Sequence, residues 1–107
     1  MIKIKRGDTF AFYANIKDEL GLPLVTDILN LKSQIRDKND SLIEELVIST
    51  TGIEGQYLFV GTNTKLWIKD GYNSENLIMD IEMTTGGIVS SSDTINIEIT
   101  KDVTYNE

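Results

Sequence analysis

Three segments of this chain alternate apolar side chains with other residues, and this alternation constrains the fold more than any other feature. They are residues 8–16, 76–84 and 93–100. Successive side chains of a β-strand point to opposite faces of the sheet, so a period of two is typical of a half-buried strand. The side chains expected to point inward are Phe10, Phe12, Ala14, Ile16, Leu77, Met79, Ile81, Met83, Ile95, Ile97 and Ile99.

Segment 24–36 fits two patterns. A helical stripe fits Leu24, Ile28, Leu31 and Ile35, and a strand fits Leu29, Leu31, Ser33 and Ile35. A strand over 30–37 is favoured because residues 41–48 can pair with it through a turn at 38–40. This hairpin is expected to point Leu42, Leu46 and Ile48 inward and to leave Glu44 on the same face, at a rim.

Shorter strands are expected at 56–60 and 88–91, and Ile2 and Ile4 alternate with lysines at the start of the chain. Residues 61–75 predict one helical turn or irregular corner, with Trp67 filling an edge of the core. The sequence thus predicts an all-β, Ig-like β-sandwich, or a partly closed barrel, of about seven or eight short antiparallel strands. Residues 1–100 are expected to form one domain, with at least six strands and under about 15% helix, and the tail 101–107 is expected to fray.

The charge balance disfavours nucleic acid and anionic membranes as partners. Lys and Arg number 10 against 17 Asp and Glu, which gives a formal net charge of −7. Proteins that bind nucleic acid normally present a basic face to the phosphates, and here the one cationic cluster is Lys3, Lys5 and Arg6. No secretory signal or apolar run long enough to span a bilayer is evident.

The chain lacks the residues that most kinds of catalysis require. The chain has no histidine and no cysteine, which removes the Ser-His-Asp and Cys-His arrangements and thiolate metal sites. Catalysis by paired carboxylates remains chemically feasible, and its candidate residues are Asp80, Glu82 and Glu98. We expect no enzyme, no cofactor and no catalytic site.

The remaining motifs are better explained by turns. The loop residues Asp18, Glu19, Asp37, Asn39 and Asp40 could offer oxygen ligands to calcium, but their spacing is not that of an EF-hand, so no metal is expected. Ser90–Ser92, a run beside a strand without a base partner, and Gly86-Gly87 are expected to be turn residues. The tripeptide Arg6-Gly7-Asp8 matches an integrin motif, but it is expected to turn or kink the chain as it enters a strand, where Gly7 could give a bulge and Asp8 could cap the turn.

The order of these framework segments resembles a known group of proteins. The segments are residues 4–10 (IKRGDTF), 33–37 (SQIRD), Trp67, 77–82 (LIMDIE), 87–91 (GIVSS) and 95–104 (INIEITKDVT). They resemble small β-sandwich structural proteins of tailed bacteriophages and prophages, and are similar, more loosely, to the amino-terminal module of upper baseplate proteins. The resemblance implies a virion component of tail, baseplate or head accessory structure, assembled in the host cytoplasm.

Two other roles stay open. A carbohydrate-binding or host-surface adhesion domain would expose several aromatic side chains on one face, and its candidates are Trp67, Tyr57, Tyr72 and Tyr105. The other open role is that of a small regulatory protein of a prophage. For the virion role, we expect other virion proteins or sister copies as partners. The cationic strand Met1–Arg6 is expected either to extend a sheet at such an interface or to pair inside its own sheet with its lysines in water.

Overall fold

A computed structural model describes residues 2–69 and 71–101. Of these residues 56% lie in β-structure and 6% in short 3-10 helices, so the prediction of an all-β protein with little helix is confirmed. The described elements are β1 (Ile2–Lys5), β2 (Phe10–Asn15), η1 (Ile28–Asn30), β3 (Leu31–Asp37), β4 (Leu42–Glu45), β5 (Val47–Thr50), β6 (Gln56–Gly61), η2 (Thr64–Leu66), β7 (Ser74–Thr85), β8 (Ile88–Ser91) and β9 (Ile95–Thr100).

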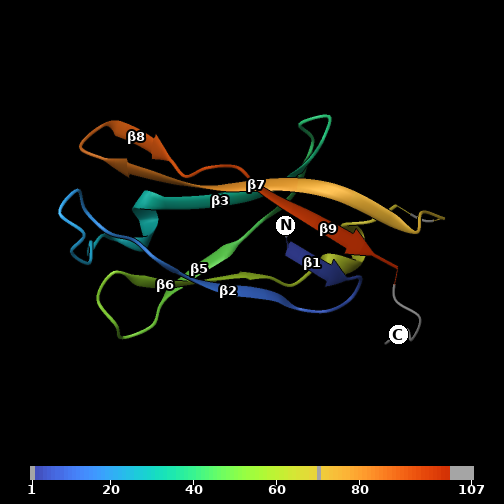
Figure 1. The fold of residues 1–107 in the computed structure, drawn as a ribbon, viewed down its shortest axis with the longest axis horizontal. Coiled ribbons are helices and arrows are strands. Elements are labelled where there is room, and N and C mark those ends of the chain that lie inside the picture. The colour runs from blue at the N-terminus through green and yellow to red at the C-terminus, as the bar shows by residue number, and fades with distance from the viewer. Residues whose placement is uncertain (1, 70, 102–107) are drawn as a thin grey trace.

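The strands form two sheets that pack face to face (Figure 1). The large sheet has the order β1-β9-β7-β3-β4, with β8 also paired to β7, and the small sheet has the order β2-β6-β5. All pairings are antiparallel except that of β1 with β9, which is parallel. Among the described strands no pairing joins the two sheets. The fold is therefore a sandwich and not a closed barrel.

The chain crosses between the sheets at both sides of the sandwich. On one side the turn after Lys5 leads from β1, an edge of the large sheet, to β2, an edge of the small sheet. On the other side Leu46 alone separates β4 from β5, and its backbone N–H donates to the carbonyl of Ser33 at 2.9 Å. The small sheet is thereby attached to the large sheet at both of its edges.

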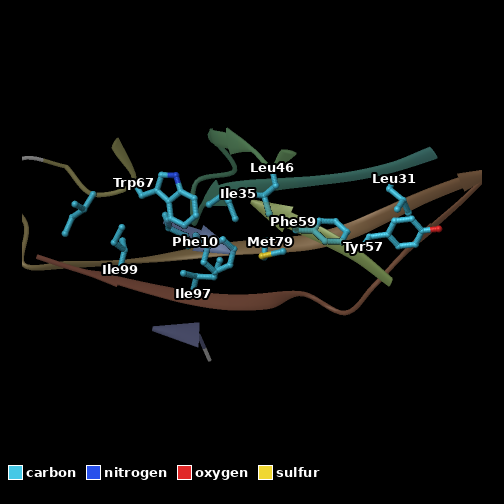
Figure 2. Close-up of a cluster of buried hydrophobic side chains, with 12 residues drawn as sticks. Phe10, Leu31, Ile35, Leu46, Tyr57, Phe59, Trp67, Met79, Ile97 and Ile99 are labelled. Atoms are coloured by element: carbon cyan, nitrogen blue, oxygen red, sulfur yellow. The ribbon is translucent and has the colours of Figure 1, made fainter. Parts of the chain in front are cut away.

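The core lies between the sheets and takes its side chains from both (Figure 2). Leu77, Ile97 and Ile99 of the large sheet are fully buried, as the alternation predicts. From the small sheet, Phe12 stacks on Phe59 with the ring centroids 5.0 Å apart. Burial of this apolar surface is the main favourable contribution to the free energy of folding.

The corner between β6 and β7 carries Trp67, as expected. One 3-10 turn, η2, precedes it, and the indole is only 1% exposed. Its ring packs edge-on against Phe10 with the centroids 5.4 Å apart. Gly61 allows this approach, because a Cβ atom there would lie 2.8 Å from Trp67 Cζ2.

The expected hairpin between 30–37 and 41–48 is correct only in part. The strand over 30–37 is confirmed as β3, but its partner β4 ends at Glu45, and β5 pairs with β6 in the other sheet. The prediction that Leu42 points inward is wrong, since its side chain is 52% exposed. The register shifts between Ile35 and Arg36, and a bulge of this kind reverses the facing of the residues beyond it. Leu46 and Ile48 do pack in the core.

The amino-terminal strand pairs inside its own sheet. Ile2 and Ile4 of β1 lie opposite Ile97 and Ile99 of β9 and are half-buried, while Lys3 and Lys5 are exposed. This pairing is the one described by the second alternative for Met1–Arg6, although Met1 itself lies outside the described residues, and a role of the strand at an interface stays a prediction. The predicted fraying of 101–107 falls almost wholly on residues outside the described ranges, 2–69 and 71–101.

The described residues include no helix with the length and the hydrophobicity that a membrane span requires.

Candidate interaction surface

The outer face of the small sheet carries no charge. Strands β2, β5 and β6 contribute six, four and six residues, and none of these is Asp, Glu, Lys or Arg. Their inward residues fill the core, so the alternate residues must point outward. We call this outer surface the uncharged face. It consists of Ala11, Tyr13, Asn15, Val47, Ser49, Gln56, Leu58 and Val60.

The uncharged face is built of two cross-strand rows. Tyr13, Leu58 and Ser49 form one row across β2, β6 and β5, and Ala11, Val60 and Val47 form the next. Tyr13 is 63% exposed and Val47 is 65% exposed, so both edges of the face present apolar surface to solvent. Leu58 and Val60 are half-buried at its centre.

The outer face of the large sheet is charged, in contrast. Cross-strand pairs on it place Lys3 beside Glu98 and Lys32 beside Glu82. Protein interfaces are depleted in charged residues at their centre and enriched in tyrosine. This difference makes the uncharged face the best candidate for an interaction surface.

The edges of the small sheet also lack features that block pairing with another chain. β2 and β5 each pair with β6 alone within the described residues. Neither strand contains proline or lysine, the residues that commonly protect an exposed edge. The edge strand β1 of the large sheet carries Lys3 and Lys5 instead.

The candidate catalytic carboxylates lie on the charged outer face. Asp80 and Glu82 line a hollow of about 310 Å³ with Gln34, Arg36 and Asp40, whereas Glu98 does not line it. The guanidinium of Arg36 donates to Gln34 Oε1 at 2.8 Å and to the Asp40 carbonyl at 2.9 Å. Asp80 and Glu82 come together, therefore, but the three predicted carboxylates do not form one cluster.

The loop carboxylates considered for calcium organise their own turns. Asp37 Oδ1 accepts hydrogen bonds from the backbone N–H groups of Asn39 and Ser41, both at 2.9 Å. Asp18 Oδ1 accepts from Leu20 and Leu22 in the same way. Such bonds are a standard stabilisation of turns by aspartate. No group of three or more potential metal ligands occurs among the described residues.

The Arg6-Gly7-Asp8 tripeptide lies in the turn that crosses from the large to the small sheet. Gly7 has a φ of +91°, which favours glycine, and it forms part of a turn, as expected for this tripeptide, and not a bulge. Its N–H donates to Thr64 Oγ1 at 3.0 Å, and that hydroxyl donates to the Asp8 carbonyl. The tripeptide is thus tied to the buried Thr64 and is not the tip of a free loop.

The aromatic candidates for glycan binding are not gathered on one face. Trp67 and Tyr57 are 1% and 2% exposed, so neither offers a stacking surface. The Tyr57 hydroxyl accepts from the Thr26 N–H at 2.8 Å and holds the segment before η1. Tyr72 is exposed, and Tyr105 lies outside the described residues.

The uncharged face was not identified from the sequence, although a signal for it was present. Segment 56–60 is apolar at four consecutive positions, and 46–48 is apolar at three. A strand with apolar residues at both its odd and its even positions has two apolar faces.

A comparison of the sequence with models of known protein families found no match, and a comparison with curated proteins found no significant similarity.

Proposed function

We propose that this chain is a non-enzymatic structural and assembly module of a bacteriophage or prophage virion that acts through protein–protein contacts. Within the virion, the proposal assigns the chain to the tail, the baseplate or a head accessory structure. The observation that carries the assembly role is the absence of charge from all strand residues of the small sheet. The virion assignment rests on the resemblance of the framework segments to β-sandwich structural proteins of tailed phages.

An uncharged apolar face suits a protein partner for a physical reason. Removal of apolar surface from water is favourable in proportion to the area covered, and it requires no match of charges. Tyr13 adds a large rigid side chain, of the kind enriched at interfaces. A glycan partner is less well supported, because Trp67 and Tyr57 are buried.

The proposal is tested in the bacterial strain that carries the gene. Particles are induced, purified on a density gradient and washed in high salt, and their proteins are identified by mass spectrometry. We expect the chain to remain with the particles at a constant ratio to the major structural proteins. Deletion of the gene should abolish particles or alter their shape in the electron microscope.

Particles that contain none of the chain, and that keep their yield, shape and infectivity after deletion, would contradict the proposal. A matched control is complementation of the deletion with the unchanged gene, which should restore the particles. Complementation with a variant that carries Leu58→Lys and Tyr13→Lys should fail, since both substitutions place charge on the uncharged face. A third variant with Asn96→Lys and Thr84→Lys, on the outer face of the large sheet, should succeed.

A further inference from the structure

We infer that the partner on the uncharged face is a second copy of this chain, packed face to face with a two-fold axis that runs along β6. The inference rests on the proposed function in that it names an occupant for the same surface. Two observations carry it, the distribution of charge and the arrangement of large and small side chains, and the size of the face limits how strong the contact can be.

The distribution of charge limits where two copies can meet. Each copy has a formal net charge of −7, so most approaches bring like charges together. The strands of the uncharged face contain no charged residue, so two copies that meet there bring no like charges of these strands together. The outer face of the large sheet would instead bring Asp80, Glu82 and Glu98 against their own equivalents in many orientations.

The two rows of the face have large and small side chains in opposite order. Tyr13 is on β2 and the small Ser49 is on β5, whereas the small Ala11 is on β2 and the larger Val47 is on β5. Rotation by 180° about an axis along β6 exchanges the positions of β2 and β5. It therefore places Tyr13 of one copy opposite Ser49 of the other, and Val47 opposite Ala11.

The same rotation places Leu58 and Val60 near the axis, where each meets its own equivalent. The face is thus complementary to itself, as a two-fold interface requires. Sheets in sandwiches pack with their strands roughly aligned, and a dimer of this kind would extend the two layers of the fold to four.

The size of the face predicts a weak dimer. Three strands about 4.8 Å apart, with up to six residues that rise about 3.4 Å each, cover roughly 300 Å². A standard interface buries about 800 Å² on each partner. We therefore expect weak, transient association, which suits contacts that are repeated many times in an assembly.

The first test measures the mass of the full chain by sedimentation equilibrium from about 1 µM to 1 mM. We expect the mean mass to rise from 12.0 kDa toward twice that value. Val47→Glu should raise the dissociation constant at least tenfold. The matched control is Val89→Glu on β8, which adds the same charge at a similar exposure, 57% against 65%, and should change the constant less than threefold.

The second test examines the predicted pairing of Tyr13 with Ser49. Tyr13→Ser removes the large side chain and Ser49→Tyr places two tyrosines opposite each other, so each change should weaken the dimer at least fivefold. The double variant exchanges the large and small positions and should recover to within threefold of the original constant. Circular dichroism checks that each variant stays folded.

The inference is overturned if the mass stays at 12.0 kDa up to 1 mM, or if Val47→Glu and Val89→Glu weaken the dimer equally. A failure of the double variant to recover would overturn the two-fold arrangement. These outcomes are separate from the proposed function. A chain that stays monomeric in solution and still remains with purified particles would refute the second copy as partner while it supports the virion role.

Discussion

The carboxylate of Glu44 accepts the indole N–H of Trp67 across a 2.8 Å hydrogen bond between Oε1 and Nε1. The same carboxylate accepts the backbone N–H groups of Thr62 and Asn63, at 3.0 and 3.1 Å. Glu44 therefore joins β4 of the large sheet to the corner that follows β6 of the small sheet. The side chain expected to be only a rim residue holds the largest core side chain in place.

Replacement of Glu44 tests this connection. Glu44→Ala leaves the buried Trp67 N–H without its acceptor, and an unsatisfied buried donor costs about 1 to 3 kcal/mol. We expect the free energy of unfolding, measured by urea denaturation, to fall by this amount. Glu44→Gln retains an acceptor oxygen for the indole and should cost about 1 kcal/mol.

The control is Glu45→Ala, one residue along β4 and exposed. It removes the same charge without touching Trp67 and should change the free energy by no more than about 0.5 kcal/mol. Equal losses for Glu44→Ala and Glu45→Ala would mean that net charge, and not the hydrogen bonds, determines the effect.

Trp67 itself should be the most costly core residue to truncate. Its side chain is 1% exposed and packs on Phe10, so Trp67→Ala should lower the free energy of unfolding by about 3 to 5 kcal/mol. Tryptophan emission of the unchanged chain should lie well to the blue of free tryptophan in water and shift to the red on unfolding. An emission maximum equal to that of free tryptophan in the folded chain would contradict the burial.

Gly61 is predicted to be intolerant of any larger residue. A Cβ atom there would lie 2.8 Å from Trp67 Cζ2 and 2.9 Å from Leu46 Cδ2. Gly61→Ala should therefore destabilise the fold by about 1 to 3 kcal/mol through overpacking. Ser49→Ala on β5 is a suitable control, because its outward side chain has no such neighbours, and a melting temperature lowered only in the Gly61 variant supports the steric explanation.

Alternation predicted the strands well wherever one face is apolar and the other polar. Strands β7 and β9 and the inward side chains Leu77, Met79, Ile97 and Ile99 were identified in this way. Trp67 was also placed correctly, since a large apolar side chain in a polar corner gains most from burial. These features depend on local sequence, which a single chain displays directly.

Features that depend on pairing between distant strands were not predictable. The division of 41–48 between two sheets follows from the hydrogen bond of Leu46 to Ser33 and from the register shift beside Ile35, and neither has a local signature. The uncharged face was missed for a related reason. Its rows join β2, β5 and β6, and the order β2-β6-β5 cannot be read from residues 10–61 taken in sequence.

The last prediction concerns β1, whose role at an interface stays a prediction. Ile4 lies opposite Ile99 and is half-buried, while Lys3 is exposed beside Glu98. If β1 acts only inside its own sheet, Ile4→Ala should lower the free energy of unfolding by about 1 to 3 kcal/mol, and Lys3→Ala should change it by less than about 0.5 kcal/mol.

Deletion of residues 1–5 separates stability from association at this edge. The deletion uncovers β9, where Ile97 and Ile99 are fully buried in the intact fold, so it should lower the melting temperature. If β1 also extends a sheet across an interface, the mean mass at high concentration should fall as well. Because the uncharged face is on the other sheet, we expect the deleted chain, assayed below its melting temperature, to dimerise within threefold of the full chain. A loss of dimerisation in a folded deletion variant would instead place the contact at β1.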